Sequence, residues 1–126
     1  LLADSGPAAA LQGINDVIAA LLPGELATAV VVELDPATGA VAVASAGHLP
    51  VLHRTADGAD LVMGGRGPAL GMLDDARYAE VRFPLAGEDR LLLYSDGLVE
   101  RRRSDLGRDL DSLRAAVAGA RPQPEE

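Results

Sequence analysis

The chain has 126 residues, of which 48% are hydrophobic and 24% are charged, and its formal net charge is -8. This length fits one ordinary domain. The negative charge disfavours binding to a nucleic-acid backbone, and one Phe, two Tyr and no Trp leave few rings to stack on bases. No run of about eighteen apolar residues is present, so no membrane-spanning segment is expected. The first residue is Leu1 rather than Met, which predicts that the chain begins inside a longer gene product.

The residue types that are missing exclude several kinds of chemistry. Without cysteine the chain has no disulfide, no thiol nucleophile and no thiolate zinc site. All eleven basic residues are Arg, so a phosphate-loop lysine and a Schiff-base lysine are also excluded. His48 and His53 are the two histidines, which excludes a zinc site made of three histidines.

The first part of the chain predicts one helix followed by a β-hairpin. Ser5-Gly6-Pro7 is a helix-start signal, because a capping hydroxyl precedes a proline that only the first turn tolerates. An apolar stripe predicts an amphipathic helix over residues 7–22, and it consists of Leu11, Ile14, Ile18 and Leu21. Asn15 lies off this stripe. The runs 28–34 and 40–45 predict two strands paired antiparallel across the turn 35–39, in which Gly39 takes a positive φ.

Further short strands and a second helix are expected after the hairpin. Residues 51–54 predict a third strand, 78–85 an outer strand, and 90–94 a short buried strand, with turns at 57–58 and 87–89. Phe83 and Tyr94 are expected in the core. Residues 109–118 predict a helix on which Leu110, Leu113 and Val117 share one face. Short consecutive strands with helices towards the ends predict the α+β class.

Asp96 is the strongest candidate for chemistry. It follows the apolar strand 90–94, and Gly97 beside it lets a cation, or water bound to the cation, approach the backbone closely. Hard divalent cations prefer such oxygen ligands. Asp-Gly is also the commonest turn dipeptide, so on spacing alone a simple turn is the favoured interpretation.

Three further segments allow both a functional and a structural interpretation. Residues 64–67 lack the lysine and the spacing of a phosphate-binding loop, which favours a surface loop. His48, after Gly47, either polarises a substrate or makes local hydrogen bonds, and the second role is commoner for a lone histidine in a turn. The basic run 101–103 either holds a phosphate or an acidic partner, or it pairs with nearby acids.

Four blocks in a fixed order carry a family resemblance. They are ATAVVVELD at 27–35, AGHLPVL at 46–52, GPALGM at 67–72 and LLLYSDGLVE at 91–100. This succession resembles the bacterial metal-dependent protein phosphatases of the PPM (protein phosphatase 2C-like) superfamily, of the sporulation stage II protein E or RsbU-like type. The resemblance covers nearly the whole chain, and the last block is its most specific part.

The resemblance implies a layered α-β-β-α sandwich with mostly antiparallel strands flanked by helices. It implies hydrolysis of phosphoserine or phosphothreonine in proteins by a metal-bound water, with two Mn²⁺ or Mg²⁺ ions and no covalent enzyme intermediate. Asp96 matches a metal-ligating aspartate and Gly97 the glycine next to it, while Gly47 and His48 match a family block that we assign to substrate binding. The implied protein is bacterial and cytoplasmic and acts in sigma-factor regulation, on a phosphorylated anti-sigma-factor antagonist.

Two metal-binding elements of the family have no match in the chain. These are an upstream aspartate that bridges both ions and an acidic ligand on the last strand. Residues 1–126 are therefore expected to be the central part of a single phosphatase domain, weak or inactive on its own. The alternatives are a non-catalytic relative that keeps the fold for protein binding, and a small α+β sensory or binding module.

Overall fold

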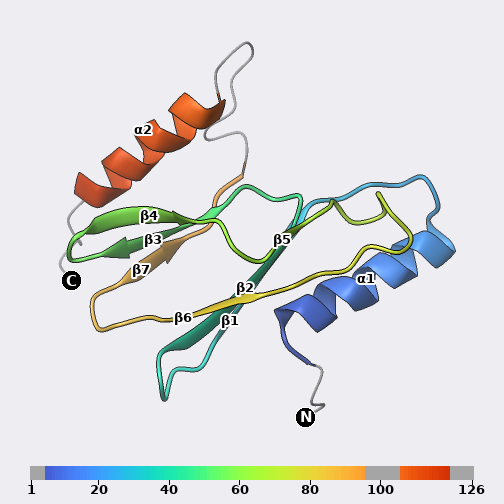
Figure 1. Ribbon diagram of the computed structural model, residues 1–126, viewed down its shortest axis with the longest axis horizontal. Coiled ribbons are helices and arrows are strands. Elements are labelled where there is room, and N and C mark those ends of the chain that lie inside the picture. Colours follow the sequence, from blue (N-terminus) through green and yellow to red (C-terminus); the bar gives the residue numbers. More distant parts are fainter. Residues whose placement is uncertain (1–4, 96–105, 120–126) are drawn as a thin grey trace, which may run out of the picture. The chain divides into compact units, whose positions relative to one another are not determined.

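In a computed structural model, the structure describes residues 5–95 and 106–119 of the chain (Figure 1). The contacts divide the chain into two units, Leu1–His48 with Met63–Leu85, and Leu49–Val62 with Ala86–Glu126. In order, the elements are α1 (Pro7–Leu21), β1 (Ala29–Leu34), β2 (Ala40–Ala46), β3 (Val51–Thr55), β4 (Gly58–Val62), β5 (Arg66–Gly67), β6 (Val81–Pro84), β7 (Arg90–Leu92) and α2 (Leu106–Gly119).

The first unit contains a four-stranded sheet built around β2. On one side residues 41–46 of β2 pair antiparallel with the whole of β1, with Val31 opposite Ala44. On the other side it pairs antiparallel with β6 and, at its last two residues, parallel with β5. The predicted hairpin is therefore confirmed. Its turn closes as expected, because Gly39 has a φ of 77° and its N–H donates to the carbonyl oxygen of Asp35 at 2.7 Å.

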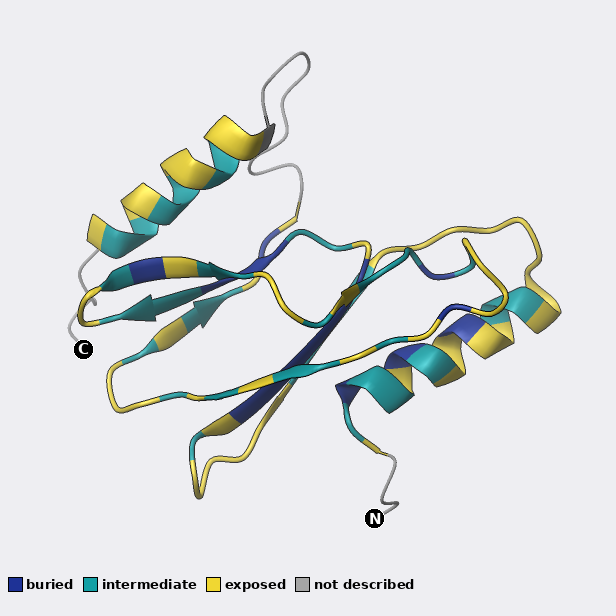
Figure 2. Ribbon diagram, in the orientation of Figure 1, coloured by how far each residue is buried: buried dark blue, intermediate teal, exposed yellow. Residues whose placement is uncertain are grey.

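Helix α1 packs against the alanines of β2. Leu11 is fully buried and lies in one cluster with Ala44, Ala46 and Leu70. Small side chains on the strand let the helix approach the sheet closely, as interior packing requires. The burial pattern along α1 is drawn in Figure 2.

The apolar stripe predicted for this helix is wrong in part. Ile14 and Leu21 are 43% and 73% exposed, whereas the polar Asn15 is fully buried. The Asn15 side chain donates to the carbonyl oxygen of Leu73 at 3.0 Å and accepts the N–H of Gly71 at 2.8 Å. A buried amide is stable when both its donor and its acceptor are bonded, and these bonds rotate the buried face of the helix away from the predicted stripe.

The predicted capping hydroxyl at the start of α1 is also wrong. The N-cap residue is Gly6, which has no side chain that could cap the helix. Instead the Oε1 atom of Glu80 accepts the N–H of Ala8 at 3.1 Å, and Glu80 also pairs with Arg82. A carboxylate at this end of a helix satisfies an otherwise open N–H and matches the positive end of the helix dipole.

The second unit contains a three-stranded antiparallel sheet in the order β4-β3-β7. Its core has Leu52, Ala59 and Tyr94 at the centre, and α2 contributes Leu110, Leu113 and Val117. The predicted second helix is confirmed and extends to Leu106–Gly119. Tyr94 is in the core as expected, whereas Phe83 in the first unit is only half-buried.

Two strands of the second unit differ from the sequence-based expectation. The segment after the 57–58 turn forms β4, which carries the exposed Asp60 and therefore lacks a continuous apolar run. The strand expected over 90–94 ends at Leu92, and Leu93 is 45% exposed. The pairing of this strand with β3 ends at Leu92, opposite Leu52.

The glycine-rich segment 64–67 is more ordered than a free surface loop. Arg66 and Gly67 pair with the end of β2, and the carbonyl oxygen of Gly65 accepts the N–H of Ser45 at 2.7 Å. With two helices and with mixed and antiparallel sheets in the described residues, the chain is α+β, as predicted. Neither described helix has the length and apolar character needed to cross a membrane.

Candidate functional site

The polypeptide that leads to Asp96 is anchored in the second unit. Strand β7 pairs with β3, and Tyr94, two residues beyond its end, is 7% exposed within the core around Leu52. Ser95 is exposed. Asp96 and Gly97 lie outside the described residues, as does the basic run 101–103. The structure thus describes the residues that lead to the predicted metal ligand, and not the ligand itself.

The turn that contains Gly47 and His48 is built on a buried serine. The hydroxyl of Ser45 donates to the carbonyl oxygen of His48 and accepts its N–H, both at 3.2 Å. Gly47 has a φ of 68°, which favours glycine, and an added Cβ would meet the backbone of Ala69 at 3.0 Å. The glycine is therefore explained by the packing of the turn, and the substrate-binding role of this pair stays a prediction.

The first and third sequence blocks and the first residues of the second block come together in the first unit. The N–H of Gly47 donates to the carbonyl oxygen of Gly67 at 2.8 Å, which joins the second block to the third. Ala27 and Leu70 bond each other through both backbone groups, at 3.1 and 2.8 Å, which joins the first block to the third. The first and second blocks also pair directly, through Ala29 and Ala46. Residues up to 43 positions apart in sequence, Ala27 and Leu70, thus belong to one hydrogen-bonded structure.

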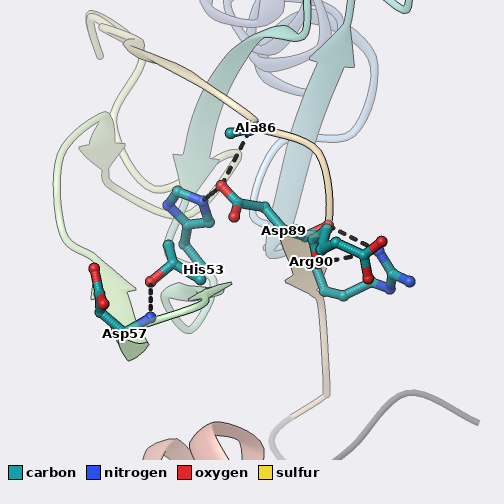
Figure 3. Close-up of polar contacts among 7 residues, drawn as sticks. His53, Asp57, Ala86, Asp89 and Arg90 are labelled. Atoms are coloured by element: carbon teal, nitrogen blue, oxygen red, sulfur yellow. Dashed lines mark hydrogen bonds and ion pairs between the residues drawn. The ribbon is translucent and has the colours of Figure 1, made fainter.

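His53 and Asp89 form a polar pair that the sequence did not single out. The Nε2 atom of His53 lies 2.9 Å from Oδ2 of Asp89, and the two side chains are 19% and 12% exposed (Figure 3). The same oxygen accepts the N–H of Ala86 at 3.1 Å. These two bonds, with the charge of His53 as a smaller contribution, hold the pKa of Asp89 below its ordinary value. Asp89 was visible only as part of a turn, and nothing in the local pattern linked it to His53.

The lowered pKa of Asp89 predicts an acid-dependent loss of stability. A carboxylate whose pKa is lower in the folded state stabilises the fold at pH values above its unfolded pKa, near 4. That contribution is lost as the pH falls through the folded pKa. At pH 7 we therefore expect the wild type to have a larger free energy of unfolding than Asp89→Asn, with a difference that shrinks below about pH 4. Urea unfolding of both proteins from pH 7 to pH 3 measures this difference, and a pH-independent difference would contradict the prediction.

The described residues do not by themselves fit a centre for divalent ions. Such ions need several oxygen or imidazole donors that converge on one point. Within residues 5–95 and 106–119, no group of three His, Asp or Glu side chains is arranged in this way. A hollow of about 420 Å³ on the first unit contains Glu33, Asp35 and Arg82 in its wall, but neither Gly47 nor His48. Asp96, the side chain predicted to bind the metal, lies outside the described residues.

Comparison with known proteins identifies the fold and the family. A crystal structure of the RsbU and RsbW domains of a Mycobacterium tuberculosis protein superposes with a TM-score of 0.70 and 30% sequence identity, over 82% of this chain. Phosphoserine phosphatase RsbP of Bacillus subtilis is 30% identical over 73 residues, or 58% of this chain. The chain spans 29% of the mycobacterial chain and 18% of the length of RsbP.

The match to the family itself is complete along the sequence. The profile of the family described as Stage II sporulation protein E (SpoIIE) matches residues 1–126, which include all four sequence blocks. The resemblance inferred from those blocks is therefore confirmed. The chain belongs to the Stage II sporulation protein E family.

Proposed function

We propose that this chain is the central part of a metal-dependent protein phosphatase domain, which hydrolyses phosphoserine or phosphothreonine in proteins. The observation that carries the proposal is the family match over residues 1–126. It is supported by the similarity to RsbP, which is named a phosphoserine phosphatase. The absence of cysteine is consistent with a phosphatase that forms no cysteinyl-phosphate intermediate.

The proposed cofactor is Mn²⁺ or Mg²⁺, with two ions in the intact domain. Asp96 is the proposed ligand in this chain, with the backbone of Gly97 beside it, and the other ligands are proposed to lie outside residues 1–126. The residues just before Asp96 support this role, because strand β7 pairs with β3 and Tyr94 is buried in the core of the second unit. Gly47 and His48 are proposed to contact the substrate from the turn held by Ser45.

The proposed context is sigma-factor regulation in the cytoplasm of a bacterium. The substrate is proposed to be a phosphorylated anti-sigma-factor antagonist. Two similarities support this: the relative RsbP, and the solved chain that combines RsbU and RsbW domains. The proposal assigns the chain to a phosphoprotein substrate, and it excludes free metabolites as the main substrate class.

A substrate panel tests the proposal in the intact protein that contains this chain. The panel contains a phosphoserine protein, a phosphothreonine protein, free nucleotides and sugar phosphates, each with and without Mn²⁺. Release of phosphate from the phosphoproteins, dependent on Mn²⁺, is the expected result. Hydrolysis of the small molecules alone would overturn the proposal, and protein binding without hydrolysis would favour a non-catalytic relative.

A further inference from the structure

Strand β7 is held by few backbone contacts. It has three residues and lies at the edge of its sheet, so that within the second unit it pairs with β3 alone. The register places Leu92 opposite Leu52 and Leu91 opposite His53. Leu92 and Tyr94 in the core favour this register, because a register is best specified where one face of a strand is buried. With so few backbone bonds, further side-chain contacts add to that specification. The contacts of the residues just before β7 therefore matter for its position.

Asp89 supplies such a contact at the entrance to the strand. Its backbone N–H donates to the carbonyl oxygen of Ala86 at 2.7 Å, and its Oδ2 atom accepts the N–H of Ala86 at 3.1 Å. The same Oδ2 atom is 2.9 Å from Nε2 of His53 on β3 (Figure 3). One carboxylate oxygen thus ties the 86–89 turn to itself and to the neighbouring strand. We call Asp89 and His53 the β7 clasp.

The chemistry of the clasp fixes which atom carries the proton. An ionised carboxylate only accepts hydrogen bonds, so Nε2 of His53 is the donor. The bond forms with the neutral ring and with the charged ring alike. Both side chains are mostly shielded, at 19% and 12% exposure, which distinguishes the clasp from a solvated surface pair.

We propose that the β7 clasp sets the register of β7 and thereby positions Asp96 for catalysis. Its catalytic consequence rests on the proposed phosphatase function. A slip of one residue moves a strand by about 3.3 Å and turns each side chain to the other face of the sheet. Such a slip takes Leu92 out of the core around Leu52 and displaces the segment that leads to Asp96. Misplacement of a reacting group by about 1 Å can cost roughly 100-fold in rate.

The clasp is tested with variants of the intact protein. His53→Leu and Asp89→Ala remove the bond between β3 and the turn that leads into β7. His53→Gln keeps an N–H donor near the position of Nε2 and serves as the rescuing variant. Asp60→Asn is the matched control, because Asp60 is the exposed cross-strand neighbour of His53 on β4 and is not part of the clasp.

Two measurements separate the clasp from the proposed function. Hydrogen exchange at the backbone amides of residues 90–92 reports the pairing of β7 without any need for activity or metal. We expect exchange to rise at least about tenfold in His53→Leu and Asp89→Ala, while His53→Gln and Asp60→Asn stay near the wild type. With a phosphoprotein substrate, we expect kcat to fall about 10- to 100-fold in the two disrupting variants with little change in KM, and His53→Gln to restore it.

Each outcome decides one part of the proposal. Unchanged exchange in the disrupting variants would overturn the clasp, whatever the activity. Increased exchange with unchanged kcat would overturn the positioning of Asp96. If the wild-type protein hydrolyses none of the phosphoproteins, the proposed function fails, and the exchange result alone decides whether the clasp sets the register.

Discussion

Replacing Asp96 with Asn in the intact protein is expected to lower phosphatase turnover by more than about 100-fold, while the fold survives. Asn has nearly the shape of Asp but lacks the negative charge that attracts a divalent cation. Loss of a group that merely supports a metal ligand typically costs 10- to 100-fold, so loss of a ligand is expected to cost more. The measurement is the Mn²⁺-dependent release of phosphate from a phosphoserine protein, with circular dichroism to confirm the fold.

The chain contains a matched control for this substitution. Asp57-Gly58 is a second Asp-Gly pair, located in the turn between β3 and β4, where Asp57 is exposed. Its backbone N–H donates to the Thr55 hydroxyl at 3.2 Å, and Asn can keep that bond because the donor is the main chain. Asp57→Asn is therefore expected to retain wild-type turnover. Near-normal activity of Asp96→Asn would instead favour the interpretation of Asp96-Gly97 as a simple turn.

Replacing Leu52 with Ala is expected to lower the free energy of unfolding by about 2–5 kcal/mol. Leu52 is fully buried at the centre of the second unit, between Leu61 on β4 and Leu92 on β7. Truncation removes apolar area from the core and leaves a cavity that the sheet and α2 fill only in part. Urea unfolding of the variant and the wild type measures the difference.

A substitution at a nearby exposed leucine distinguishes the loss of core packing from the mere loss of an apolar side chain. Leu93 is 45% exposed, and exposed positions usually change stability by less than about 0.5 kcal/mol when substituted. Leu93→Ala is therefore the control, with an expected effect much smaller than that of Leu52→Ala. Equal losses in the two variants would contradict the assignment of Leu52 to the core of the second unit.

Local sequence patterns were sufficient for the α+β class, the first hairpin and both helices. These features depend on contacts between residues close in sequence. The runs 28–34 and 40–45 are separated by a turn in which Gly39 adopts the required positive φ of 77°. The order of the four blocks was also sufficient to recognise the family, because that order can be read from the sequence without knowing the fold.

The polar contacts that hold these elements in place depend instead on segments distant in sequence. Asn15 bonds Leu73 across 58 positions, Ala8 bonds Glu80 across 72, and His53 bonds Asp89 across 36. Hydrophobic periodicity placed Asn15 on the outer face of its helix, and the local cap signal pointed to Ser5 rather than Glu80. A polar side chain becomes buried only where another segment supplies its missing donor or acceptor. That segment is brought near by folding, so no pattern within one helix or turn encodes the pair.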